Sequence, residues 1–169
     1  MRRFCPSRLR LLVVASLVTG LAVACGVLDS APSPTPTPTA NQSLGLEIAE
    51  TYGRLMLHTR LIVDPRPPAP QVKEQLRGLG QEFKVQFANY ACLLDTMSGA
   101  DQAEVAAAFD ANRIRFLPAD MSWFEEAAGD YDFEDTAIRP LLQEIETLDD
   151  YAFLDRVAQS RPGEELLCG

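Results

Sequence analysis

Apolar residues recur at helical spacing along most of the chain from about residue 44 onward. In the first stretch they lie three, four or seven residues apart, which places them on one face of a helix. These positions are Leu44, Ile48, Tyr52, Leu55 and Ile62. The segment DPRPPAP follows, and its four prolines in seven residues predict a loop that ends this first helix.

The second predicted helix has the clearest pattern in the chain. Its apolar positions repeat every seven residues, with further apolar residues between them, and such a seam packs lengthwise against neighbouring helices. The repeat consists of Leu76, Phe83, Tyr90 and Met97, and the intervening residues are Leu79, Phe87 and Leu94. Gly99 suits the left-handed position that follows the end of a helix.

Shorter helices are predicted after Gly99. Asp101 with Glu104 is typical of a capping box that opens a third helix. A fourth helix is expected from Ser122 to Gly129, a fifth over 136–148 with Pro140 in its first turn, and a sixth over 149–159. No segment alternates with the period of two that strands require. The fold class is therefore expected to be all-α, a small helical bundle of two long and several short helices over residues 44–169.

The N-terminus has the three parts of an export signal. The basic segment MRRFCPSRLR precedes the uncharged apolar run LLVVASLVTGLAVAC, so residues 1–24 are predicted to be a signal peptide. The small residue Ala24 directly before Cys25 resembles the lipobox of bacterial lipoproteins, although the usual leucine lies one place early, at Leu21. The resemblance implies cleavage before Cys25 and attachment of a lipid to its thiol. The protein would then be lipid-anchored to the cell membrane, outside the cytoplasm.

Two alternatives to the lipoprotein signal stay open. The tripeptide Ala22-Val23-Ala24 also fits an A-x-A site for ordinary secretion. The charge-free run over residues 11–28 also reaches the lower limit of about 18 residues for a membrane span, which leaves an uncleaved anchor as a second alternative.

A proline- and threonine-rich segment follows Cys25. Prolines alternate from Pro32 to Pro38, which excludes a helix and favours polyproline II. Residues 25–43 are therefore predicted to be a lipid-anchored, disordered linker. At about 3.1 Å per residue, its length would hold the domain roughly 40 Å from the membrane.

The cysteine count supports lipidation. Cys25, Cys92 and Cys168 remain after removal of the signal, and an odd number of exported thiols leaves one unpaired. Lipidation of Cys25 leaves an even pair, and in an oxidising compartment we expect a disulfide between Cys92 and Cys168. Two free thiols, one of them buried, are the alternative.

The net charge of the chain argues against one class of partner, nucleic acids. The formal net charge is −9, and it becomes −13 when the signal segment with its four arginines is removed. The acid is concentrated in residues 101–169, which carry seventeen acidic and five basic side chains. A nucleic-acid partner is not expected, because phosphate binding needs a basic surface.

The sequence offers few groups for catalysis or cofactor binding. His58 is the single histidine and is expected at the surface or the edge of the core. Di-iron, haem and zinc sites need further histidine or cysteine ligands at suitable spacing, so no cofactor is expected. Motifs for nucleophilic catalysis and phosphate binding are missing as well. A carboxylate pair, as in glycoside hydrolysis, is the catalytic option that this composition leaves.

The segment SWFEEAAGDYDFEDT combines aromatic and acidic residues. Its aromatic residues are a candidate partner-binding patch if Trp123 and Tyr131 are exposed, and core residues if they are buried. They are Trp123, Phe124, Tyr131 and Phe133. The acids could form a loose cation site, although an EF-hand is excluded because Asp135 and Leu141 replace its glycine and glutamate. These acids are Asp130, Asp132, Glu134 and Asp135.

Three functions follow from these observations. We favour a membrane-tethered, non-catalytic binding or accessory module at the cell envelope, held by the lipid at Cys25 and presenting an acidic helical surface to a protein or an envelope polymer. The alternatives are a carboxylate-dependent hydrolase of envelope polymer, with two acids across a cleft, and a sensor of a cation or small ligand. No family is recognised for the domain beyond the lipobox.

Overall fold

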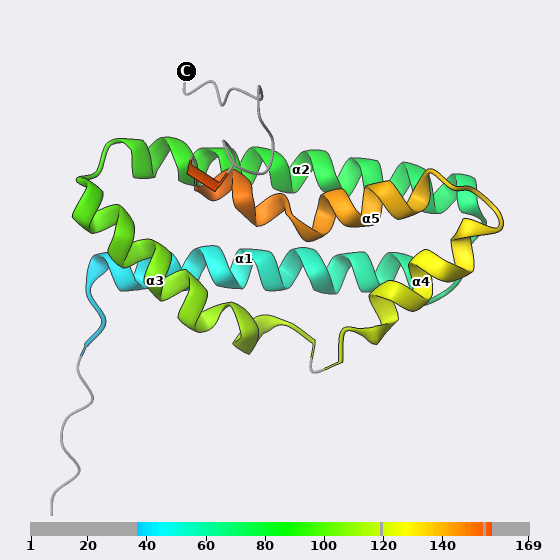
Figure 1. The fold of residues 1–169 in the computed structure, drawn as a ribbon, viewed down its shortest axis with the longest axis horizontal. Coiled ribbons are helices and arrows are strands. Elements are labelled where there is room, and N and C mark those ends of the chain that lie inside the picture. The colour runs from blue at the N-terminus through cyan, green and yellow to red at the C-terminus, as the bar shows by residue number, and fades with distance from the viewer. Residues whose placement is uncertain (1–36, 119, 154, 157–169) are drawn as a thin grey trace, which may run out of the picture. The chain divides into compact units, whose positions relative to one another are not determined.

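Two long helices run in opposite directions in the computed structural model, which describes residues 37–118, 120–153 and 155–156 (Figure 1). These helices are α1 (Ala40–Val63) and α2 (Ala69–Asp95). They are followed by α3 (Gly99–Phe116), α4 (Ser122–Asp132), α5 (Ile138–Glu146) and the 3₁₀-helix η1 (Leu148–Ala152). The described residues contain no strand, and the predicted all-α bundle of two long and several short helices is confirmed.

The two apolar seams predicted from the sequence form much of the core. Ile48, Tyr52 and Leu55 are almost completely buried on α1. On α2 the buried seam residues are Leu76, Leu79, Phe83, Phe87 and Leu94, while Tyr90 is half-buried. Met97, also half-buried, lies just past the end of the helix. Burial of each large apolar side chain stabilises the fold by about 1.5–3 kcal/mol before the entropy of ordering is counted. The core is completed by side chains from α3, α4, α5 and η1.

α3 packs closely along the first half of α1 because two glycines leave room for it. A Cβ atom at Gly45 would lie 2.5 Å from the carbonyl oxygen of Val105, and a Cβ at Gly53 would lie 2.5 Å from the Cβ of Phe116. Both distances are far below ordinary contact, so any larger residue would push α3 away from α1. No local pattern in the sequence predicts this close approach.

The first two helices begin earlier than predicted. Thr39 caps α1 by accepting a hydrogen bond from the backbone N–H of Gln42, whose side chain accepts one from the N–H of Thr39. The last four residues of the predicted linker, 40–43, therefore belong to the first turn of α1. α2 begins at Ala69 because Pro70 falls in its first turn, where a missing N–H costs little.

The predicted ends of other helices also need correction. Ser98, rather than Asp101, caps α3, because its side chain accepts a hydrogen bond from the N–H of Asp101. Gly99 is consequently the first residue of α3 and does not end α2 in a left-handed conformation. α4 continues past Gly129 to Asp132.

The C-terminal elements agree with the prediction in part. Pro140 lies in the first turn of α5, as expected. Residues 148–152, at the predicted start of the sixth helix, form the 3₁₀-helix η1 instead. The predicted signal peptide, Cys25 and Cys168 lie outside the described residues.

Candidate functional site

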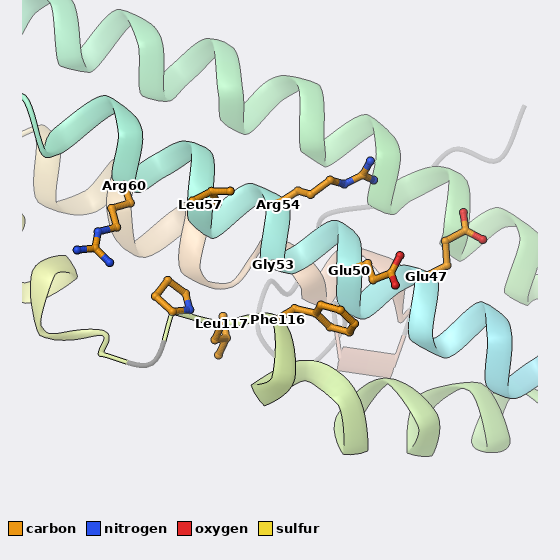
Figure 2. Close-up of a pocket in the computed structure, with 9 residues that line it drawn as sticks. Glu47, Glu50, Gly53, Arg54, Leu57, Arg60, Phe116 and Leu117 are labelled. Carbon is orange, nitrogen blue, oxygen red and sulfur yellow. The ribbon is translucent and has the colours of Figure 1, made fainter. Parts of the chain in front are cut away.

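A groove of about 730 Å³ runs along the outer face of α1 (Figure 2). One wall is formed by side chains of α1 at the three- and four-residue spacings that place them on one helix face. The other wall is the end of α3 and the two residues that follow it. The lining residues are Glu47, Glu50, Gly53, Arg54, Leu57, Arg60, Phe116, Leu117 and Pro118. We call this feature the α1 groove.

The α1 groove exists because α3 stops halfway along α1. Leu117 is extended, with φ −74° and ψ 148°, and a residue before proline is biased away from the helical conformation. Pro118 therefore directs the chain away from the α3 axis. Gly53 has no side chain and lets Phe116, the last residue of α3, pack against the middle of α1.

Apolar side chains at the α1 groove are accessible to solvent. Leu57 is 50% exposed, and Phe116, Leu117 and Pro118 on the opposite wall are half-buried. Leu57 lies outside the buried face of α1. An apolar contact surface of this kind, with a few charged groups beside it, is typical of a binding site for another molecule.

The charged residues of the α1 groove differ in how far they are already paired. Glu47 accepts a hydrogen bond of 2.9 Å from the hydroxyl of Tyr90. Arg54 donates one of 2.9 Å to the hydroxyl of Thr51. Among the described residues, Glu50 has neither a hydrogen-bond partner nor an ion-pair partner.

Arg60, at the other end of the α1 groove, is engaged with its neighbours. Its guanidinium forms an ion pair of 3.1 Å with Asp64, one turn further along α1. It also lies 6.0 Å from the ring centroid of Trp123 on α4. Arg60 therefore links α1 to α4 and has less capacity for a ligand than Glu50.

Most of the candidate partner-binding patch predicted from the sequence is in the core. Trp123, Phe124 and Tyr131 are each at most 7% exposed, and the condition for the patch, exposure of Trp123 and Tyr131, is not met. Tyr131 also donates a hydrogen bond of 2.8 Å to the carbonyl oxygen of Pro67. Phe133, at 95% exposure, is the member of this set that solvent reaches.

The four acids of the same segment do not form the predicted cation site. Asp130 pairs with Arg66 at 2.8 Å, and Asp132 pairs with Arg139 at 2.7 Å. Asp135 pairs with Lys73 and accepts a hydrogen bond of 2.9 Å from the N–H of Ala137. Three of the four carboxylates thus each pair with a different basic side chain, and Glu134 is exposed. Over the described residues, no three acidic, histidine or cysteine side chains gather closely enough to hold a metal ion.

The remaining predicted residues can be placed only in part. His58 is exposed and contacts the ring of Phe83 edge-on at 6.0 Å, as expected for a histidine at the edge of the core. Cys92 is half-buried near the end of α2. Because Cys168 lies outside the described residues, the disulfide between these two cysteines stays a prediction.

A buried polar cluster joins α1, α3 and η1 in the core. The hydroxyl of Tyr52 donates to the carbonyl oxygen of Glu146 at 2.9 Å and accepts from Arg113 at 3.1 Å. Arg113 also lies 3.4 Å from a carboxylate oxygen of Asp149, which is 2% exposed. Burial raises the pKa of Tyr52 to about 12 and that of Asp149 to about 6, while Arg113 opposes both rises.

This cluster is separate from the α1 groove, because none of its three side chains lines the groove. A carboxyl with a raised pKa is a candidate general acid only where a substrate can reach it. Asp149 is buried against Arg113, so we assign the cluster to the structure of the core. The α1 groove is therefore the better candidate for a functional site.

Comparison with known proteins does not assign the chain to a family. No family model, curated protein or solved structure matches the chain significantly. Among the helices that the structure describes, none combines the length and the apolar character needed to cross a bilayer.

Proposed function

We propose that the protein is an exported lipoprotein, tethered to the membrane through Cys25, whose helical domain is a non-catalytic binding module of the cell envelope. The α1 groove is the observation that carries the binding function. It offers solvent-accessible apolar surface beside carboxylates on a rigid helix, which suits recognition of a partner. The tether is supported by the lipobox-like segment that ends at Cys25 and by the proline-rich residues that follow it.

The layout of the α1 groove favours binding over hydrolysis. A glycosidase needs two carboxyl groups on either side of the scissile bond. Glu47 and Glu50 lie three residues apart on the same helix, so they belong to the same wall. The opposite wall consists of Phe116, Leu117 and Pro118, which carry no carboxylate.

The tether is tested by cell fractionation in the native host. We expect the protein to stay with the membranes and the variant Cys25→Ser to appear in the soluble exported fraction. The mass of the purified protein should begin at Cys25 and include a diacylglyceryl group, with two thiols, from Cys92 and Cys168, appearing only after reduction. An unmodified Cys25 would contradict the lipoprotein assignment.

The binding function is tested by photo-crosslinking from the α1 groove. A photoreactive phenylalanine analogue replaces Leu57 in one protein and Val85, an exposed apolar residue on α2, in the control. Both proteins are irradiated in native cells. We expect a discrete adduct from position 57 and none of the same mass from position 85. Equal adducts from both positions, or none from position 57, would contradict a binding function for this groove.

A further inference from the structure

The charges at the two ends of the α1 groove differ in what they can still bind. At the end near the start of α1, Glu50 has no partner among the described residues, and Glu47 uses one oxygen to accept a hydrogen bond from Tyr90. At the other end, Arg60 is paired with Asp64. An incoming cation therefore finds the free carboxylate of Glu50, whereas the guanidinium of Arg60 is already engaged by Asp64.

Arg54 does not cancel this asymmetry. A glutamate and an arginine four residues apart on a helix often form an ion pair, but Arg54 donates to the hydroxyl of Thr51 instead of Glu50. Figure 2 shows the Glu50 side chain directed toward the side of α1 on which Phe116 lies, while Arg54 and Glu47 extend toward the opposite side, where hydrogen bonds link both of them to Thr51 and Tyr90. Glu50 is thus the charged group best placed to meet an occupant of the groove.

The apolar part of the groove begins next to these carboxylates. Leu57 follows Glu50 by two helical turns, and the opposite wall is formed by Leu117 and by Phe116, which packs against Gly53. The lining residues from Glu47 to Arg60 span about 20 Å of helix at 1.5 Å per residue. A chain in extended conformation covers this length with about six residues.

We propose that the α1 groove takes a short extended peptide segment of a partner protein, in which a lysine or arginine next to Glu47 and Glu50 is followed by apolar residues against Leu57 and Phe116. This inference rests on the proposed binding function and specifies its partner. The two carboxylates contribute attraction and orientation, and the apolar side chains contribute most of the affinity.

The test compares two hexapeptides by isothermal titration calorimetry on the intact protein at low salt. One is the blocked peptide Lys-Lys-Leu-Leu-Ala-Leu, and the other carries Gln-Gln in place of Lys-Lys. We expect the lysine peptide to bind about tenfold more tightly, and we expect 0.5 M salt to remove most of that difference. Equal affinities for the two peptides would overturn the proposed basic partner. The binding function of the groove would then be judged separately, by the crosslinking experiment at position 57.

Charge reversal separates the groove from the general acidity of the protein. The variant Glu47→Lys/Glu50→Lys should lose the preference for the lysine peptide and bind a Glu-Glu-Leu-Leu-Ala-Leu peptide better. The matched control Glu74→Lys/Glu82→Lys makes the same charge change on exposed positions of α2, outside the groove. It should keep the preference of the unmodified protein. An equal loss in both variants would assign the attraction to net charge and overturn the proposal.

The apolar half of the site is tested in the same assay. Leu57→Asp should weaken binding of the lysine peptide at least tenfold, whereas Val85→Asp should leave it unchanged, and circular dichroism confirms that both variants are folded. A second copy of this chain is the alternative occupant of such a groove, and sedimentation velocity measures whether the protein self-associates. Self-association that Leu57→Asp abolishes would identify that occupant and overturn the peptide proposal.

Discussion

Gly45 and Gly53 are single residues that decide how closely two helices approach. Because they have no side chains, the backbone of α3 approaches α1 more closely than a Cβ atom at either position would permit. A larger residue substituted for Gly45 must displace backbone atoms of α3. The nearest neighbours of a Cβ at this position include the carbonyl oxygen of Val105 at 2.5 Å. Helix packing of this kind is fixed by shape and cannot relax by rotation of a side chain.

We therefore expect Gly45→Ala to destabilise the domain by about 1–3 kcal/mol, the usual cost of overpacking. Gly78→Ala is the matched control, since nothing lies within 4 Å of a Cβ at that exposed position of α2. It should stabilise the domain by about 0.5–1 kcal/mol, because alanine favours a helix more than glycine does. Urea unfolding of both variants measures the two effects, and similar shifts in the same direction would refute the close approach of α3.

Asp149 gives the domain a pH dependence of defined sign. Its folded pKa of about 6 lies above its ordinary value of 3.8, because burial outweighs the attraction of Arg113. The folded protein therefore holds this proton more tightly than the unfolded chain. The contribution of Asp149 to stability is greatest below pH 3.8, falls as the pH rises, and reaches its lower limit above about pH 6.

The variant Asp149→Asn isolates this effect, because other acids such as Asp101 and Asp135 have lowered pKa values and act in the opposite direction. Between pH 4 and pH 7.5 the free energy of unfolding of the unmodified protein should fall relative to the variant by up to about 3 kcal/mol. Denaturant unfolding at the two pH values gives this difference. A difference that does not change with pH would mean that Arg113 fully compensates the burial of Asp149.

At the scale of elements, the sequence predicted where helices exist better than where they begin. The seams through Tyr52 and Phe83 identify α1 and α2 because a buried stripe must repeat with the period of the helix. The start of α1 was missed although its signal, Thr39 followed by Gln42, stands in the sequence, because the neighbouring prolines suggested a continuous linker. The start of α2 is hidden in a similar way, because Pro70 in its first turn continues the proline-rich segment that predicts a loop.

The α1 groove could not be predicted from the sequence because its walls come from separate segments. Phe116 meets Gly53 only through the packing of α3 on α1, and no local pattern encodes that contact. The one signal available was Leu57, an apolar residue outside the buried face of its helix. The prediction of an exposed aromatic patch was wrong for Trp123 and Tyr131. On a short helix such as α4, the sequence does not indicate which face packs against the core.

The cap of α1 leads to a prediction for that helix. Thr39 accepts from the N–H of Gln42 and donates 2.7 Å to Glu104 on α3. Thr39→Ala should lower the free energy of unfolding by about 1 kcal/mol, the usual cost of losing a helix N-cap. Thr37→Ala, the same change at an exposed position before the helix, should have no effect. Thermal unfolding followed by circular dichroism compares them, and equal melting temperatures for the two variants would argue against the capping role.

For the whole domain, α1 is the helix on which the others are assembled. It contacts α2, α3, α4, α5 and η1, and the groove lies on a face of α1 that the end of α3 covers only in part. A partner bound there would touch the central helix directly. The first turn of α1 therefore matters to the whole domain, because it fixes the start of this helix to α3.

This arrangement predicts where a minimal domain must begin. Asn41 donates hydrogen bonds of 2.9 Å to both Asp101 and Glu104, and Thr39 supplies the cap, so a chain that starts at Leu44 loses all of these contacts. We expect residues 44–169 to be less stable than residues 37–169 by at least about 1 kcal/mol, the usual cost of losing a helix N-cap. Residues 37–169 should match the stability of the chain that begins at Cys25. Denaturant unfolding of the three proteins decides between a domain that begins at Thr39 and one that begins at Leu44. If the shortest chain were as stable as the other two, residues 39–43 would be part of the linker after all.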